Sequence, residues 1–224
     1  LKRECGGRKR RFQRLTTCEQ VLFGINLSGK TIAVTGTTNG IGIETARHLA
    51  LAGAHVICLN RNKELSERKI EEVKKEKPNV DLSFIQCDLA SLASVRAAAE
   101  ELMEKYQKLD VLILNAGLMM PPSHTTVDGL ATVFGVNHVG HFHLTTLLLP
   151  LLKSSVPARI VVVSSEGHAH TEINPRGSLE QKLALLMPEI EEHVGMKGGF
   201  TQYGRSKMCN VLFAMKLHRD LEGK

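Results

Sequence analysis

Five short runs of β-branched and other apolar residues alternate with longer stretches of helical pattern over most of this chain. The strand-like runs are 31–35, 55–59, 82–86, 111–114 and 160–163. The helical stretches are 41–51, 63–77, 92–106, 127–154 and 201–221, and the segment 166–199 is rich in loop-forming residues. Strands separated by helices of this length predict βαβ units, in which right-handed crossovers place helices on both faces of a parallel sheet. The pattern therefore restricts the chain to an α/β, doubly wound fold.

Length and composition set the scale of that fold. The 224 residues suit one large domain, and a hydrophobic content of 42% is enough for a sizeable core. The aliphatic stretch 144–152 is far shorter than the roughly 20 residues of a membrane-spanning helix, so no span is expected. The basic N-terminus has no apolar region of the kind that a secretory signal needs. Tryptophan does not occur, which excludes modules built around it, including the WW domains that bind proline-rich peptides.

The net charge of +6 belongs to the N-terminal segment. Residues 1–30 contain eight Lys or Arg and two Glu, and the remainder of the chain is balanced. A basic tail on a neutral domain argues against a nucleic-acid-binding surface. We therefore expect residues 1–27 to form a basic linker or tail and residues 28–224 to form the domain. The run GRKRR at 7–11 fits a nuclear-import signal or a solvated linker, and the linker is the preferred interpretation.

The cysteines and histidines give no sign of a metal site. Five cysteines without a CxxC pair argue against a disulfide framework or a zinc ribbon. They favour a reducing compartment, so we expect a cytoplasmic protein, with the nucleus as an open addition. His138, His141 and His143 are spaced three and two apart, and a helix cannot place all three on one face. We expect them to pack and hydrogen-bond within a helix.

A glycine-rich turn, TGTTNGIG at 35–42, joins the first strand to the first helix. Residues without a Cβ let the backbone turn tightly and approach a pyrophosphate, whose charge meets free N–H groups at the helix start. This position between strand and helix predicts a Rossmann-like dinucleotide site, although the GxxxGxG spacing differs from the usual GxGxxG. The alternative is a structural turn in an unrelated α/β fold. The predicted cofactor-binding residues of the turn are Gly36, Thr37, Thr38, Asn39, Gly40, Ile41 and Gly42.

The end of the second strand bears on the choice of dinucleotide. Enzymes that prefer NAD usually place a carboxylate here to hold the ribose hydroxyls, whereas this chain has Asn60 followed by Arg61. A guanidinium pairs with a 2′-phosphate, so Arg61 favours NADP(H) over NAD(H), the alternative being an exposed arginine without a ligand. Asp88, after the third strand, fits a helix N-cap and an acceptor for an adenine amine equally well.

Tyr203 and Lys207 lie four residues apart near the start of the last helix, which puts them on one helix face. A nearby cation stabilises a phenolate, so a tyrosine in this setting can exchange a proton with a substrate oxygen. An ordinary surface pair has the same spacing. The surrounding motifs therefore decide between the two interpretations.

Five motifs in order resemble those of the short-chain dehydrogenase/reductase family, over about residues 28–222. They are the glycine turn, Asn115-Ala116-Gly117 after the fourth strand, Val136-Asn137-His138, Ser164-Ser165 after the fifth strand, and the YxxxK motif of Tyr203 and Lys207. The resemblance implies hydride transfer between a nicotinamide and a carbonyl or alcohol carbon.

The same resemblance implies a role for each matching residue. Tyr203 would be the acid/base, and Lys207 would bind the nicotinamide ribose and stabilise the phenolate. Ser165 would hydrogen-bond the substrate oxygen, and Asn137 would hold a proton-relay water at a helix kink. Asn115, Ala116 and Gly117 would brace the sheet beside the cofactor.

Local sequence points to two branches of the family. Segments 11–30, 157–174 and 203–221 resemble the dehydrogenase part of the WW domain-containing oxidoreductases, and VNHVGHF at 136–142 is shared with the retinol dehydrogenases. These branches imply a small lipophilic alcohol or ketone, steroid-like or retinoid-like, as substrate. The family also implies a homodimer formed through the two long helices. The competing hypothesis is a nucleotide-binding scaffold in signalling or apoptosis regulation that retains the motifs with weak or no catalysis.

The last helical stretch is followed by no further strand-like run. Members of the family continue with another strand and a segment that covers the substrate. We therefore expect a domain truncated after the catalytic helix, with a sheet incomplete at its C-terminal edge and the run 160–163 as an open apolar edge strand. Weak or absent turnover is the corresponding expectation.

Overall fold

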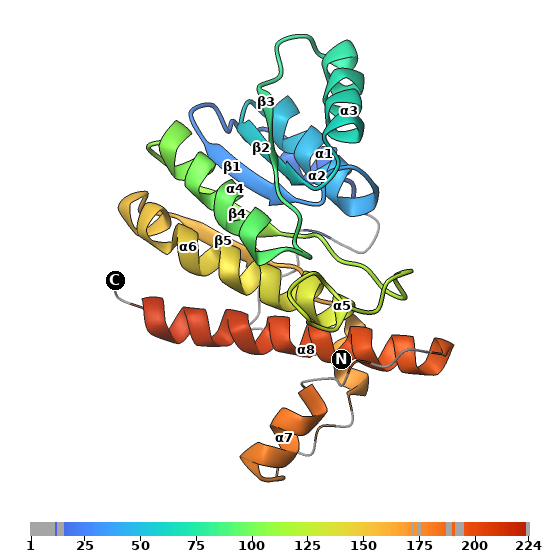
Figure 1. Cartoon of the computed structure of the whole chain (residues 1–224). Helices are drawn as coiled ribbons and strands as arrows, with labels where there is room; N and C mark the ends of the chain where they lie inside the picture. The colour runs from blue at the N-terminus through green and yellow to red at the C-terminus, as the bar shows by residue number, and fades with distance from the viewer. Residues whose placement is uncertain are drawn as a thin grey trace.

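A five-stranded parallel sheet forms the centre of the molecule (Figure 1). The structure is a computed structural model and describes residues 12, 16–171, 173, 176–186, 190 and 195–222. The strands follow the order β3-β2-β1-β4-β5, and every neighbouring pair is parallel. They are β1 (Thr31–Thr35), β2 (His55–Asn60), β3 (Leu82–Gln86), β4 (Val111–Leu114) and β5 (Arg159–Val162). This is the doubly wound, Rossmann-like order, so the predicted fold class is confirmed.

Helices cover both faces of this sheet. The elements are α1 (Cys18–Leu22), α2 (Gly40–Leu51), α3 (Lys63–Glu76), α4 (Leu92–Lys105), α5 (Thr132–Phe134), the π-helix η1 (Gly135–Val139), α6 (Gly140–Ser154), the 3-10 helix η2 (Glu166–His170), α7 (Leu179–Leu186) and α8 (Met196–Leu221). In Figure 1, α4, α6 and α8 run side by side over one face, and α2 and α3 lie with β2 and β3 on the other side.

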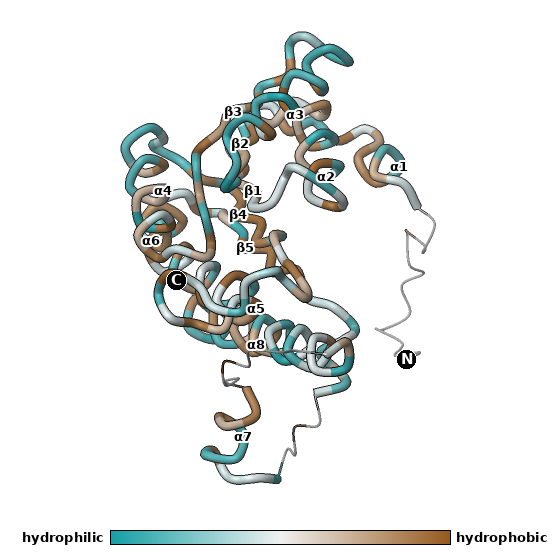
Figure 2. The backbone as a smooth tube through the Cα atoms, turned by 45° about the vertical axis from the view of Figure 1, so that its right-hand side comes forward, coloured by the Kyte–Doolittle hydropathy of each residue, from teal (hydrophilic) through white to brown (hydrophobic). Residues whose placement is uncertain are grey.

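Two hydrophobic clusters follow from the alternation of side chains along the strands. Ala33 and its equivalents on the other strands pack against α4, α6 and Phe213 of α8. Ile32 and Val34 face the opposite way and pack against α2 and α3. Because both faces are covered there, the strands β1, β2 and β4 are hydrophobic along most of their length, and Figure 2 draws the central strands in brown.

Several predicted boundaries are wrong. The long helix predicted for 127–154 begins at Thr132, because Val127 and Asp128 form a turn closed by a hydrogen bond from the N–H of Gly129, whose φ is +76°, to the carbonyl of Thr126 (3.0 Å). It is also interrupted by η1, where the N–H of Gly140 donates to the carbonyl of Gly135. The loop-rich segment 166–199 contains η2 and α7, and α8 begins at Met196, five residues before the predicted start.

The predicted tail 1–27 holds a short helix in its described part. Thr17 and Gln20 cap α1 with reciprocal side-chain-to-backbone hydrogen bonds, which supports five helical residues. Leu27 then packs against the cluster on the α2 and α3 face. The basic run 7–11 lies outside the described residues.

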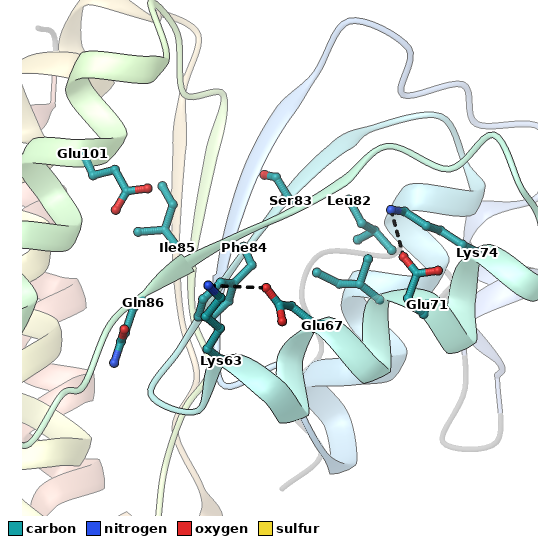
Figure 3. A pocket seen from close by; sticks show the side chains of 11 residues that line it. Lys63, Glu67, Glu71, Lys74, Leu82, Ser83, Phe84, Ile85, Gln86 and Glu101 are labelled. Carbon is teal, nitrogen blue, oxygen red and sulfur yellow. Dashed lines mark hydrogen bonds and ion pairs between the residues drawn. The ribbon is translucent and has the colours of Figure 1, made fainter.

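The two edges of the sheet differ in character. Beside β3, a hollow of about 510 Å³ is lined by charged side chains, among them the ion pairs Lys63–Glu67 (3.9 Å) and Lys74–Glu71 (3.2 Å) (Figure 3). Such charges disfavour pairing with another strand. Beside β5, a hollow of about 410 Å³ is lined mostly by aliphatic side chains of α6, β5 and α8, and Val161 is 43% exposed. Within the described residues, β5 is an open apolar edge, as expected from the sequence.

Across the parts of the chain that the structure describes, we find no helix with the length and apolar character needed to cross a bilayer.

Candidate functional site

A groove of about 710 Å³ lies at the carboxyl ends of the strands. Ligands of open α/β sheets bind where the strand order reverses, which is here between β1 and β4. The groove gathers residues from the glycine turn, from the ends of all the other strands and from α8. Of the predicted residues, those lining it are Gly36, Thr38, Asn39, Gly40, Ile41, Gly42, Arg61, Asp88, Asn115, Ala116, Gly117, Ser165, Tyr203 and Lys207. Thr37 and Asn137 do not line it.

The glycine turn is locked against the turn that follows β4. Gly36 has φ +72°, and a Cβ placed on it would lie 2.8 Å from Cα of Ala116. A Cβ on Gly42 would lie 1.9 Å from the carbonyl oxygen of Gly36. The side-chain amide of Asn115 donates to the carbonyls of Thr35 (3.0 Å) and Gly36 (3.2 Å). The bare backbone and the first turn of α2 therefore line the groove as a cradle that is chemically able to hold an anion.

Thr37 fixes the glycine turn to the end of β2 through two hydrogen bonds with Asn60. Its N–H donates to Oδ1 of Asn60 (2.7 Å), and the amide of Asn60 donates to Oγ1 of Thr37 (2.8 Å). Both side chains are buried, so Asn60 braces the turn. Arg61, the next residue, is exposed and lines the groove. The Thr37–Asn60 pair was not predicted from the sequence, although a polar residue at the end of a fully buried strand is a signal for such a contact.

Asp88 is not a helix N-cap. Ser91 caps α4 by accepting from the N–H of Ser94, whereas Oδ1 of Asp88 accepts from the N–H of Ala90 (2.9 Å) in the preceding turn. Asp88 lines the groove from this turn. Its alternative role as an acceptor for an adenine amine stays a prediction.

The two serines after β5 have different partners. Ser164 Oγ donates to the carbonyl of Lys207 (2.8 Å), which occupies its proton. Ser165 Oγ accepts from the N–H of Gly167 (3.2 Å), so its own O–H remains a donor for a ligand. Gly204 allows this segment to pack on α8, because a Cβ there would lie 2.7 Å from the carbonyl oxygen of Gly167. This geometry favours Ser165 over Ser164 as a substrate ligand.

Tyr203 and Lys207 project from α8 into the same groove. Nζ of Lys207 lies 5.6 Å from the centre of the Tyr203 ring and donates to the carbonyl of Val163 (3.2 Å). Lys207 is only 2% exposed, and this burial lowers its pKa. A Cβ on Gly117 would lie 3.2 Å from Nζ, so this glycine lets the backbone approach the ammonium. The structure thus brings the predicted tyrosine, lysine and serine together.

Asn137 lies behind the groove, in η1, and is fully buried. Its Oδ1 accepts from the N–H of Leu118 (2.8 Å), and its amide donates to the carbonyl of Leu118 (2.9 Å) and to Oγ of Ser206 (3.0 Å). The side chain therefore ties the turn after β4 to α8. The helix irregularity predicted at this residue exists as the π-helical turn, and its role in holding a water stays a prediction.

A buried histidine adjoins these groups. His141 is 1% exposed, its Nε2 lies 2.8 Å from Oγ1 of Thr35, and its Nδ1 lies 3.1 Å from the carbonyl oxygen of Asn137. Burial lowers the pKa of His141 to about 4. His138 contacts Asn210 and the rings of Phe134 and Phe213. Packing and hydrogen bonding are thus confirmed for both histidines.

Within the described residues, three or more His, Cys, Asp or Glu side chains do not come together as a metal site. The described cysteines are free thiols. Cys58, Cys87 and Cys209 are buried and Cys18 is exposed. Cys5 lies outside the described residues.

Comparisons with known proteins agree with this geometry. Residues 30–174 match the short chain dehydrogenase family. The human WW domain-containing oxidoreductase is 41% identical over 214 residues, covering 95% of this chain and 50% of that protein. Human retinol dehydrogenase 14 is 40% identical over 210 residues, covering 88% of this chain and 59% of that protein. The chain thus spans about half the length of the curated relatives it matches.

A solved structure gives the same result for the fold. The crystal structure of a short chain dehydrogenase from Escherichia coli complexed with NADPH superposes with a TM-score of 0.66 at 26% identity, covering 87% of this chain and 72% of that chain. The two branches expected from the sequence are both among the relatives. With its fold, its groove and its matching residues, this chain belongs to the short-chain dehydrogenase/reductase family.

Proposed function

We propose that the groove binds NADP(H) and that the protein is an oxidoreductase acting on a small lipophilic alcohol or ketone. One observation carries the proposal: Tyr203, Lys207 and Ser165 line the same groove as the glycine turn. A tyrosine that can exchange a proton, placed beside a turn that can hold the pyrophosphate of a dinucleotide, suits a reaction in which the cofactor transfers a hydride and the protein transfers a proton.

The cradle fits a dinucleotide. Gly40 has φ +54° and open space where a Cβ would be. Oδ1 of Asn39 accepts from the N–H of Gly40 (2.7 Å), so the N–H groups of Ile41 and Gly42 are the ones that would meet a pyrophosphate. The solved short chain dehydrogenase from Escherichia coli is a complex with NADPH. When bound, the nicotinamide supplies the hydride donor or acceptor.

The protein's own residues handle the substrate oxygen. In the reducing direction, Ser165 Oγ donates a hydrogen bond to the carbonyl oxygen, and Tyr203 Oη delivers the proton that converts it to a hydroxyl. The Lys207 ammonium, buried beside the ring, stabilises the phenolate left behind. In the oxidising direction the same phenolate removes the hydroxyl proton.

Preference for NADP(H) rests on Arg61. The position where NAD enzymes place a carboxylate is Asn60, whose amide is already bonded to Thr37. Because position 60 has no carboxylate, a 2′-phosphate bound there would not be repelled. The exposed guanidinium of Arg61, the next residue, lines the groove and can pair with that phosphate.

The substrate class rests on the apolar loop after β4 and on the relatives. Leu118 lines the groove, and Met119 and Met120 extend from it as exposed apolar side chains. A related protein is named a retinol dehydrogenase. A homodimer is part of the proposal, supported by the exposed apolar side chains Phe142 on α6 and Met215 on α8.

The test is NADPH-dependent reduction of hydrophobic aldehydes and ketones by wild type, Tyr203→Phe and Tyr106→Phe. Tyr106 is the matched control, because its hydroxyl contacts Ser83 Oγ (3.0 Å) of β3, away from the groove. We expect Tyr203→Phe to bind NADPH and lose turnover, while Tyr106→Phe retains both. Equal turnover in all three would refute the role of Tyr203. NADPH binding without turnover in any of them would support the scaffold.

A further inference from the structure

The buried imidazole of His141 has a fixed hydrogen-bonding direction. Thr35 Oγ1 accepts from the N–H groups of Asn115 and Ala116, both at 3.0 Å. These use the two acceptor sites of the hydroxyl, so its own proton is left for Nε2 of His141 at 2.8 Å. Nε2 must therefore accept, and the ring carries its proton on Nδ1.

The other side of the ring requires the same tautomer. Nδ1 lies 3.1 Å from the backbone carbonyl of Asn137, and a carbonyl can only accept. The neutral Nδ1–H form satisfies both contacts at once. A protonated ring would direct an N–H at a Thr35 oxygen that already accepts two hydrogen bonds.

These contacts close a ring of hydrogen bonds. The N–H groups of residues 115 and 116, in the turn after β4, donate to Thr35 Oγ1, and Thr35 Oγ1 donates to His141. His141 in turn donates to the backbone carbonyl of Asn137. The side chain of Asn137 then returns to both backbone groups of Leu118, three residues after Asn115. Gly117 lies inside the segment so enclosed, and its backbone faces the Lys207 ammonium.

We infer that His141 is a positioning residue, whose Nδ1–H imidazole closes this ring and fixes the backbone of residues 115–118 opposite Lys207 and Tyr203. The inference deepens the proposed function and rests on it for its catalytic meaning. The ring of hydrogen bonds exists without cofactor, so its geometry can be tested separately from cofactor binding. His141 does not line the groove, and it acts through the backbone that does.

Three substitutions separate the two hydrogen bonds of the imidazole, one to Thr35 and one to Asn137. His141→Asn can keep an N–H near the Nδ1 position toward Asn137 and loses the acceptor for Thr35. His141→Gln can place an oxygen near Nε2 for Thr35 and loses the donor to Asn137. His141→Leu removes both. Leu148→Ala, two turns further along α6 and fully buried, is the control for loss of stability alone.

The first readout is independent of cofactor. Nitrogen-15 NMR of the cofactor-free wild type should show His141 as the Nδ1–H tautomer at neutral pH. Hydrogen exchange at the Asn115 and Ala116 amides should be about tenfold faster in His141→Leu and unchanged in Leu148→Ala, after correction for global stability. An Nε2–H tautomer, or equal exchange in these two variants, would overturn the inference.

The second readout is NADPH binding, followed by the fluorescence of the cofactor. We expect His141→Leu to weaken binding about tenfold, with His141→Asn and His141→Gln intermediate and Leu148→Ala at the wild-type value. Wild-type affinity in all His141 variants, or weakening that only follows the melting temperature, would contradict a positioning role. If the wild type itself binds no NADPH, the proposed function fails while the exchange measurement still decides whether the ring exists.

Discussion

Gly42→Ala is the substitution that most directly probes the cradle. The added Cβ would lie 1.9 Å from the carbonyl oxygen of Gly36 and 2.5 Å from the side-chain nitrogen of Asn115. Real Cβ contacts are essentially never closer than 3.0 Å, so α2 and the glycine turn must separate. The nearest atom belongs to the backbone, and a rotamer change cannot relieve the clash.

The expected losses of stability and of NADPH affinity follow from the contacts that this separation breaks. Overpacking of this kind costs about 1–3 kcal/mol of stability. Shifting the start of α2 also removes N–H groups from the pyrophosphate, and a hydrogen bond to a charged group contributes about 1.5–3 kcal/mol. The dissociation constant for NADPH should therefore rise roughly 10- to 100-fold.

Gly129→Ala is the matched control. Gly129 also has a positive φ, +76°, with open space around it, and it lies outside the groove. An alanine there is strained by about 1–2 kcal/mol, so stability falls while NADPH affinity stays at the wild-type value. Circular dichroism and thermal unfolding would establish that both variants are folded. NADPH binding by folded Gly42→Ala with wild-type affinity would refute the argument about the cradle.

Three further predictions address specificity, catalysis and acid stability. Arg61→Ala should weaken NADPH binding about tenfold and leave NADH binding unchanged, measured by parallel titrations; equal losses for both would contradict 2′-phosphate recognition. Ser165→Ala should reduce turnover about 10²-fold with NADPH affinity retained, and Ser164→Ala should reduce it less, because only Ser165 has a free O–H. The pKa of His141 is about 4 in the fold, below its ordinary value near 6.5, so the unfolded chain binds more protons below pH 6.5. The contribution of His141 should therefore lower the free energy of unfolding by about 3 kcal/mol as pH drops from 6.5 toward 4, and urea denaturation should show a smaller total fall in His141→Leu.

Local patterns were sufficient to predict the strands and the glycine turn. The runs 31–35, 82–86 and 111–114 coincide with β1, β3 and β4. For the central strands β1 and β4, this is because strands covered on both faces have nearly continuous apolar sequences that differ from helical periodicity. The turn at 35–42 could be recognised because Gly36 and Gly40 have positive φ values of +72° and +54°, a backbone requirement that is local to the turn.

Tertiary features could not be predicted in this way. The π-helical turn η1 depends on which carbonyl each N–H finds, and the apolar periodicity of a helix does not encode that choice. The Thr37–Asn60 pair joins residues 23 positions apart, and the contact of Thr35 with His141 spans 106 positions. Such polar contacts become visible only once the strands are in register.

The proposed function depends on NADP(H) binding in the groove at the carboxyl ends of the strands. A titration of the chain with NADPH and with NADH, each followed by cofactor fluorescence, tests this binding, with circular dichroism on the same sample. The absence of tryptophan keeps the protein background low. Saturable binding with a clear preference for NADPH is the predicted result. A folded chain that binds neither nucleotide would contradict a nucleotide-binding role for the groove.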